Sequence, residues 1–421
     1  MSNPDSPSSV PVLFVGIDWA SKKHDLCWIA TDGRTESHTF EHEEPKIRKM
    51  LELLEQAAQG GPIAIALEKS RGPLQRLLEA QPGIQLYLID PKQFDHYRRS
   101  FVSSTAKADL SDARRLAQMV KERYQELKRF EPSDPATRRI GLLSETRRKL
   151  VDQKTAIIQQ LTQLLRGYYP LALELGSPER VLVRTVLRRW PDPTQFRRAH
   201  PEMLRELLRK YRFGNAEEIE AMILKIRQDK PIGGDPLVTE SSIFQLQAGL
   251  GQLKVLISQI KKIDQTIQTA TAQHPDAKLF KGIRGAGPSL TPRLLAALGS
   301  DRQRYKSAEE LMVVAGIAPV TRQSGNSKTV RSRVATSKFL RQTFHEFAAS
   351  TCRQKGWANL FYKAYRAAGM AHHAAVRKIA AKWIRILFKV WKDRVQYDET
   401  RYLDALKKKN PNLSILSPAN P

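Results

Sequence analysis

The first 130 residues alternate short apolar runs with amphipathic stretches, as in a domain whose strands and helices share one core. Apolar runs bounded by polar residues predict strands at residues 12–18, 25–31, 35–41, 63–68 and 85–89. Apolar residues three or four apart predict helices at residues 44–58, 72–80 and 109–123. Three successive strands followed by alternating helices and strands predict an α/β domain over residues 12–130.

Beyond residue 138 the pattern becomes helical. Apolar residues at spacings of three, four or seven run from about Arg138 to Arg166, and again from Phe244 to Ile267. Two helices of this kind can pair as an antiparallel coiled coil, form an oligomer seam, or belong to an ordinary helical core. Between them, residues 167–240 are rich in Arg and interrupted by seven prolines. We therefore expect a helical region over residues 138–275 with a small helical module inserted at 167–240.

Residues 276–409 are predicted to form a further helical domain. Within it, residues 279–298 resemble a helix-hairpin-helix, in which Gly285 and Gly287 permit a tight turn and backbone N–H groups meet a phosphate. A plain Gly-rich helix junction is the alternative. A predicted helix from Met370 to Arg394 places Trp383 on its apolar side, and its basic side either follows phosphates or faces solvent. The polar ends, residues 1–11 and 410–421, are predicted to be disordered.

The charge is unevenly distributed. The chain has 70 Lys and Arg residues against 43 Asp and Glu residues, a formal net charge of +27. Residues 1–130 hold 19 basic and 18 acidic side chains, whereas residues 131–421 hold 51 and 25. The excess favours a polyanionic partner, of which nucleic acid is the leading candidate. A basic ribosomal-type or membrane-surface protein is the alternative, but no lipid-anchor motif accompanies the charge.

Two cysteines, Cys27 and Cys352, form neither a CxxC pair nor a zinc-ligand spacing. This usage favours a reducing cytoplasm. The first eleven residues lack the basic start and apolar core of a signal peptide. No apolar stretch approaches the roughly 20 residues needed to span a bilayer, so no membrane partner is expected.

Four carboxylates occupy positions that predict a metal site. Asp18 and Glu68 each end a predicted buried strand, and Asp109 and Asp112 lie three apart on a predicted helix, where they share a face. Gathered at one point, four carboxylates would repel one another without cations. Two divalent ions about 3.5–4 Å apart can hold the attacking and leaving oxygens of a phosphoryl transfer. The pattern therefore predicts a two-metal phosphodiester site, although an Asp-x-x-Asp spacing is also common on solvated helix faces.

A serine in the last domain lies among cations. Ser324 is followed by Gly325 and flanked by four basic residues, Arg322, Lys328, Arg331 and Arg333. A serine hydroxyl attacks phosphorus if a base removes its proton and cations stabilise the growing charge. Read without further context, Ser-Gly is a turn sequence, and catalysis is the alternative that the residues alone leave open.

The order of strands and helices up to residue 123 resembles the ribonuclease H-like fold, whose acids come from the first strand, the fourth strand and a late helix. The motifs resemble more closely the DEDD transposases of bacterial insertion sequences, the IS-one-ten group, which are similar to pilin-gene-inverting recombinases. The resemblance rests on the RuvC-like segments Val15 to Asp18, Ala66 to Glu68 and Lys107 to Asp112, and on Gly285 through Gly325. Residues 167–240 are outside it.

The resemblance implies a mechanism and partners. Asp18, Glu68, Asp109 and Asp112 would bind Mg²⁺, and Ser324 would become joined covalently to DNA during strand exchange. It also implies a bridge RNA that pairs with donor and target DNA, assembly as a dimer or tetramer, and a bacterial location at the nucleoid. The alternatives are a RuvC-type Holliday junction nuclease, which needs the acids but not Ser324, and a non-catalytic nucleic-acid-binding protein, which leaves the acids unexplained.

Overall fold

The computed structural model describes residues 10–68, 72–100, 111–229, 235–325, 327–331, 333 and 336–409. The chain divides into two compact units, residues 1–132 and residues 133–421. Both predicted tails fall almost entirely outside the described residues. None of the described helices is both long enough and apolar enough to cross a membrane.

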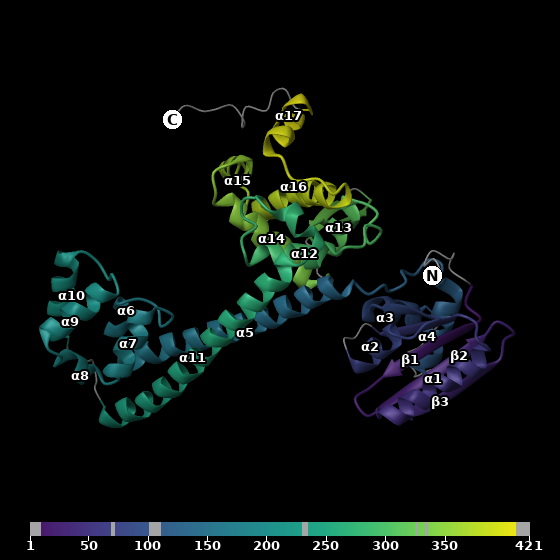
Figure 1. Ribbon diagram of the computed structural model, residues 1–421, viewed down its shortest axis with the longest axis horizontal. Helices are drawn as coiled ribbons and strands as arrows, with labels where there is room; N and C mark the ends of the chain where they lie inside the picture. The colour runs from purple at the N-terminus through teal and green to yellow at the C-terminus, as the bar shows by residue number, and fades with distance from the viewer. Residues whose placement is uncertain are drawn as a thin grey trace. The chain divides into compact units, whose positions relative to one another are not determined.

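The first unit is built on a five-stranded mixed sheet in the order β3-β2-β1-β4-β5 (Figure 1). Its strands are β1 (Leu13–Trp19), β2 (Lys23–Ala30), β3 (Thr35–Glu41), β4 (Ile63–Glu68) and β5 (Ile84–Ile89). The first three pair antiparallel, whereas β4 runs parallel to β1 and β5 parallel to β4. The five predicted strands are confirmed, with β2 beginning two residues earlier than predicted.

Helices cover both faces of this sheet because alternate residues of β1 point to opposite sides. Leu13, Val15 and Ile17 join the core formed with α1 (Glu44–Ala58) and α2 (Pro73–Glu79). Phe14 joins the opposite core, formed with α3 (Pro91–Arg99) and α4 (Asp112–Arg123). The three predicted helices are present as α1, α2 and α4, but α4 begins at Asp112, after the cap Ser111, and so three residues later than predicted. The pattern did not predict α3, which has few apolar residues and begins with an Asp90 cap on the Lys92 N–H.

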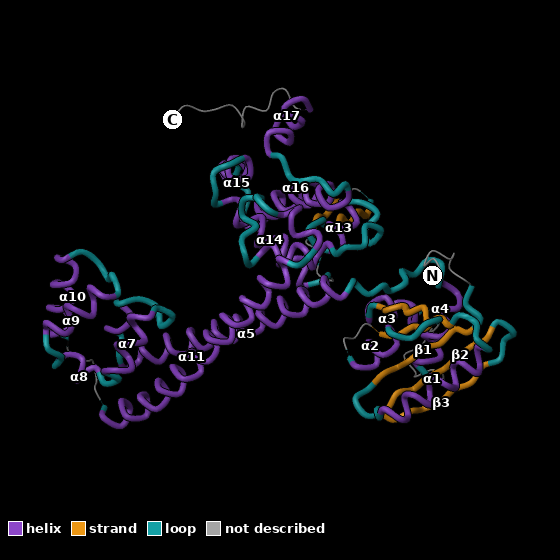
Figure 2. Tube along the Cα trace, viewed as in Figure 1, coloured by secondary structure: helices purple, strands orange, loops and turns teal. Residues whose placement is uncertain are grey.

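The second unit is organised by two long helices, α5 (Pro135–Tyr168) and α11 (Pro236–Ala272), which lie side by side (Figure 2). Their contacts pair early residues of α5 with late residues of α11. Thr137 bonds His274, just past the end of α11, at 2.9 Å, and Arg147 forms an ion pair with Asp264. The helices are therefore antiparallel. That they form a coiled coil stays a prediction.

The described residues between the two long helices form five short helices. They are α6 (Leu171–Glu174), α7 (Val181–Arg189), α8 (Pro193–Arg197), α9 (Pro201–Lys210) and α10 (Ala216–Gln228). Pro193 and Pro201 begin helices, where a missing N–H costs nothing. Their core includes Tyr169 and Phe196 and extends onto the adjoining ends of α5 and α11.

The last part of the second unit is mainly helical. It contains η1 (Pro275–Phe280), α12 (Leu290–Leu298), α13 (Ala308–Val314), a hairpin of β6 (Val320–Ser324) and β7 (Ser327–Arg331), and then α14 (Lys338–Cys352), α15 (Trp357–Ala367), α16 (His372–Lys392) and α17 (Glu399–Lys409). Trp383 of α16 is buried and donates to Thr351 at 2.9 Å, as expected for a core residue. Cys27 and Cys352 are both buried and free.

Candidate catalytic site

Asp18 and Glu68 lie at the same level on neighbouring strands. The parallel register of β1 and β4 pairs Leu13 with Ile63 and continues to Ile17 with Leu67, so the next residues are these two acids. The strand residues before them are buried, while both acids are partly exposed. The sheet therefore brings two carboxylates, 50 residues apart in sequence, to one edge.

Asp112 reaches this edge because α4 packs unusually close to β1. A Cβ atom on Gly16 would lie 2.0 Å from the Ala113 carbonyl oxygen and 2.3 Å from the Ala117 nitrogen. No residue larger than glycine fits there without moving backbone. Ser111 caps the first turn of α4 by accepting from the Arg114 N–H at 3.3 Å. Asp112, the first residue of α4, is thus held beside the ends of β1 and β4.

We expect Gly16→Ala to separate α4 from β1 and to lower the free energy of unfolding by about 1–3 kcal/mol or more, as overpacked cores do. Gly251→Ala on α11 is the control, since nothing lies within 4 Å of a Cβ there. It should be neutral or slightly stabilising. Urea titration followed by circular dichroism measures both. A Gly16→Ala protein as stable as wild type would contradict this packing.

The three acids repel one another. Burial and then the charge of Asp112 and Asp25 raise the pKa of Asp18. Burial, followed by the charges of Asp18 and Asp112, raises the pKa of Glu68, and Arg98 opposes this shift. The pKa values of Asp18 and Glu68 are thus raised first by burial and then by the negative charge of their neighbours. The electrostatics place Asp18, Glu68 and Asp112 in one cluster.

Two more side chains belong to this neighbourhood. Asp25 is the direct cross-strand partner of Asp18 on β2, and its carboxylate accepts from Thr39 at 2.7 Å. Arg98, in the last turn of α3, lies with Nη1 3.4 Å from Asp112 and Nη2 3.2 Å from Asp95. The sequence pattern missed both, although the alternation of β2 could have shown that Asp25 faces Asp18.

The donor set suits a hard divalent cation, since carboxylate oxygens are the ligands Mg²⁺ prefers. Asp109 lies outside the described residues. Within the described ranges no three His, Cys, Asp or Glu side chains are close enough to enclose an ion. Asp18, Glu68 and Asp112 are therefore near one another but not at ligand spacing.

Ser324 is the last residue of β6, and it pairs with Ser327 across a two-residue turn. Gly325 in that turn has φ +53°, a left-handed conformation that favours glycine. Ser324 is exposed, and no hydrogen bond of its hydroxyl is found in the described ranges. The turn interpretation is correct for the backbone, and it leaves the hydroxyl accessible.

The cations predicted around Ser324 are placed only in part. Arg331 ends β7 and is exposed, whereas Arg333 is half-buried and its Nε has no hydrogen-bond partner within the part of the chain that the structure describes. The side chains of Arg322 and Lys328 lie outside the description. Arg331 pairs with Val320 at the far end of the hairpin from Ser324. The described cations therefore lie at the base of the hairpin.

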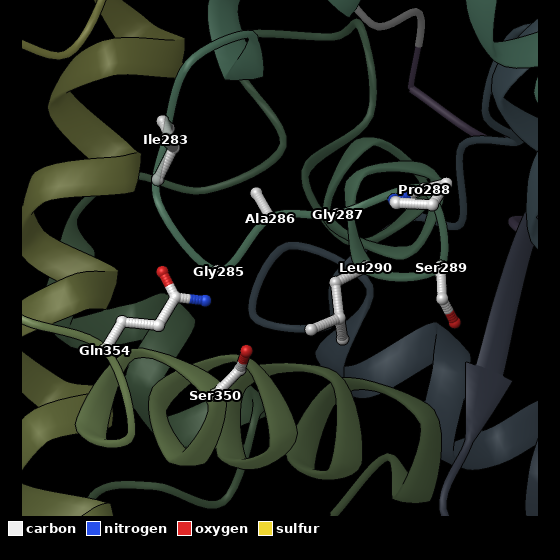
Figure 3. A pocket seen from close by; sticks show the side chains of 9 residues that line it. All are labelled: Ile283, Gly285, Ala286, Gly287, Pro288, Ser289, Leu290, Ser350 and Gln354. Atoms are coloured by element: carbon white, nitrogen blue, oxygen red, sulfur yellow. The ribbon is translucent and has the colours of Figure 1, made fainter. Parts of the chain in front are cut away.

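The predicted hairpin at residues 279–298 is a turn between η1 and α12. Gly285 has φ +86°, and a Cβ there would lie 2.7 Å from Thr351 Cγ2, so glycine is required. The turn lines a depression of about 360 Å³, toward which Ser350 and Gln354 point (Figure 3). The first N–H groups of α12, from Leu290 and Thr291, bond to the Gly287 carbonyl. A phosphate would have to displace that carbonyl, so phosphate binding at Gly285 and Gly287 stays a prediction.

Comparison with known proteins decides the family. The DEDD IS110 model, described as "Transposase", matches residues 15–170. A second model, described as "Transposase IS116/IS110/IS902 family", matches residues 277–363. The chain belongs to the IS110/IS116 family of insertion-sequence transposases. The two matched segments contain Asp18, Glu68 and Asp112 in one and Ser324 in the other.

Relatives of this transposase align over almost its whole length. The "Mini-circle putative transposase for IS117" of Streptomyces coelicolor is 27% identical over 92% of this chain and 96% of its own length. The "Insertion element IS900 uncharacterized 42 kDa protein" of Mycobacterium paratuberculosis is 24% identical over 91% of this chain and 97% of its own. An uncharacterized 44.8 kDa protein of insertion element IS116 from Streptomyces clavuligerus is also 24% identical, over 91% of this chain and 95% of its own length. The inserted helices between α5 and α11 are thus within the span shared with relatives.

Proposed function

We propose that this transposase moves its insertion sequence by serine-linked strand exchange, with Mg²⁺ held by Asp18, Glu68, Asp109 and Asp112 in a RuvC-like domain. The observation that carries the proposal is the convergence of Asp18, Glu68 and Asp112 at one sheet edge, together with an accessible serine hydroxyl on a separate hairpin. Membership of a transposase family supplies DNA as the substrate.

The acids fit the metal role because their repulsion is relieved by cations. When bound, Mg²⁺ would stabilise the charge that develops on phosphate oxygens. Asp18 and Glu68 sit on buried strands, which fix their backbone, and Asp112 is fixed by the capped start of α4. This rigidity suits a site that must hold phosphate oxygens at defined positions.

Ser324 fits the nucleophile role because its hydroxyl is exposed at a hairpin tip. Its oxygen would form a bond to phosphorus as the bond from phosphorus to the 3′ or 5′ oxygen of the strand breaks, and the departing oxygen takes a proton. The residues described around Ser324 provide no base. We therefore infer that the base is supplied by the acid site, of the same or another subunit.

A non-coding bridge RNA is the proposed guide. The support is the excess of basic over acidic side chains in residues 131–421, since residues 1–130 are nearly neutral. A transcript of the element's non-coding end should bind at least about tenfold more tightly than an unrelated RNA of equal length, if shape and sequence are read beyond the phosphates. Filter binding at several salt concentrations measures this. Equal affinity for both RNAs would remove the guide from the proposal.

Oligomer formation is proposed through α11. Leu237, Phe244 and Val255 are 74%, 68% and 59% exposed, and their spacings of 7 and 11 residues place them on one face. The opposite face of α11 contributes Leu246 and Leu250 to the core. A helix with a second, uncovered apolar face is suited to packing against another copy.

We expect Phe244→Glu to weaken self-association roughly tenfold or more, since a large apolar side chain at the centre of an interface is a typical hot spot. Leu142→Glu is the matched control, because Leu142 of α5 is similarly exposed, at 59%. Sedimentation velocity over a concentration series measures the effect. Equal association of the two variants would show that the α11 face is not the interface.

A metal-only Holliday junction nuclease remains the second candidate, since the acid cluster by itself supports hydrolysis. It predicts cleaved DNA that carries no protein. Treating the protein with Mg²⁺, element-end DNA and the transcript, and then denaturing, separates the two candidates. A protein–DNA adduct supports the transposase with a serine nucleophile, and free nicked DNA supports the nuclease.

A further inference from the structure

Arg98 lies beside the acids but has no part in the proposed metal site. Its guanidinium contacts Asp112 at 3.4 Å and Asp95 at 3.2 Å. Its charge also lies close enough to Glu68 to oppose the rise of that pKa. A guanidinium in a protein stays protonated, so Arg98 is a permanent cation within a group of carboxylates.

The position of Arg98 is fixed through a buried arginine. Arg115 of α4 is only 6% exposed, and its Nη1 lies 3.4 Å from the Arg98 carbonyl oxygen at the end of α3. No hydrogen-bond partner of its Nε is found among the described residues. Asp112 and Arg115 are three residues apart on α4 and share a face. A second contact, from the buried Tyr97 hydroxyl to Glu122 at 2.8 Å, holds the same two helices together.

We propose that Arg98 is a positioning residue with two successive partners: the Asp112 carboxylate when the acid site lacks divalent ions, and a phosphate oxygen of the DNA backbone when ions occupy it. The inference rests on the proposed metal role of the acids. A cation that binds Asp112 competes with Arg98 for the same oxygens, because both satisfy the same negative charge. The released guanidinium keeps its backbone position beside the site.

A phosphate is the chemically suited second partner. The guanidinium presents a planar fork of N–H donors that matches two oxygens of a phosphate. Arg98 is 44% exposed, so the side chain can turn toward a bound strand without unfolding α3. Arg99, the next residue, forms an ion pair with Asp95 at 3.0 Å, has no contact with Asp112 among the residues that the structure describes, and is 76% exposed. It offers the same charge without the Asp112 contact.

The test compares Arg98→Gln with Arg99→Gln in the full-length protein. Calorimetric titration with Mn²⁺ alone, without DNA, should show Mn²⁺ binding about two- to fivefold tighter in Arg98→Gln than in Arg99→Gln, as expected for loss of one partly exposed ion pair. In saturating Ca²⁺, binding of an element-end duplex should be about tenfold weaker in Arg98→Gln than in Arg99→Gln. Arg98→Lys should keep the competition but recover only part of the DNA affinity, since an ammonium lacks the fork.

Each failure has a distinct meaning. Equal or weaker Mn²⁺ binding in Arg98→Gln would overturn the competition with Asp112. Equal DNA affinity of the two variants in Ca²⁺ would overturn the phosphate role. If Asp18→Asn binds Mn²⁺ as tightly as the wild-type protein does, the acids do not bind the metal, and the basis of this inference is lost.

Discussion

Asp18→Asn is expected to abolish strand exchange, with a loss of at least about a thousandfold, because a metal ligand that stabilises transferring phosphate contributes several kcal/mol. The amide keeps the size of the side chain but not its charge. A gel assay that follows joined donor and target DNA measures the loss. Activity within tenfold of wild type would show that the acid cluster is not the metal site.

The same substitution should stabilise the ion-free protein. The pKa of Asp18 is raised in the folded state, so the folded protein holds its proton more tightly than the unfolded chain. The contribution of Asp18 to stability is therefore fully present below the usual carboxyl range near pH 4 and is lost as pH rises through the raised pKa. At neutral pH, Asp18→Asn removes this repulsion, which for a partly exposed charge pair is about 0.2–1 kcal/mol.

Asp32→Asn should change the stability of the ion-free protein in the opposite direction, and it serves as the control. The N–H and side chain of Arg34 lower the pKa of Asp32, so its ionised form stabilises the fold. Mg²⁺ extends the comparison, since an ion at a hundred times its dissociation constant should raise wild-type stability by about 2.7 kcal/mol. Asp18→Asn should lose most of that increment and Asp32→Asn none. Equal stabilisation of both variants by Mg²⁺ would contradict the site.

Ser324→Ala is expected to abolish strand exchange, as Asp18→Asn does. Loss of a nucleophile removes the covalent route, and losses near a millionfold in rate are known for nucleophiles that act as part of a unit. Folding should be unaffected, because Ser324 is exposed and its hydroxyl has no partner in the described ranges. Recombination between element and target, scored by amplification across the new junction, is the measurement.

Ser327→Ala is the matched control for Ser324→Ala. Ser327 is the cross-strand partner of Ser324 and is also exposed, so it shares the hairpin, the residue type and the environment. We expect Ser327→Ala to recombine within a few-fold of wild type. Equal losses in the two variants would mean that the hairpin matters as a surface and that Ser324 is not the nucleophile.

The first unit was predictable because its signals are local. Apolar runs such as Ile63 to Leu67 are buried on both sides of the sheet, and their ends fix where Asp18 and Glu68 lie. The sequence shows Gly16 as part of a motif, but it does not show why a glycine is needed at that position. Only the structure shows that α4 lies against that glycine.

Other features depend on contacts between segments far apart in the chain. Helix α3 has a polar sequence held by Phe94 and Tyr97, too few apolar residues for a periodic signal. The role of Arg98 depends on its contact with Asp112, 14 residues later, which the local sequence does not show. The antiparallel pairing of α5 with α11 was one of several options in the sequence, and the Arg147–Asp264 ion pair distinguishes it.

Serine-linked strand exchange is tested most directly by identifying the residue that carries DNA after the reaction. Wild-type protein would be incubated with Mg²⁺, element-end DNA and the transcript, denatured, digested with nuclease and protease, and analysed by tandem mass spectrometry. We expect a nucleotide on the peptide that contains Ser324, absent from Ser324→Ala and retained in Ser327→Ala. Nicked DNA released equally by all three proteins, with no nucleotide-bearing peptide, would contradict it and make the protein a metal-dependent nuclease.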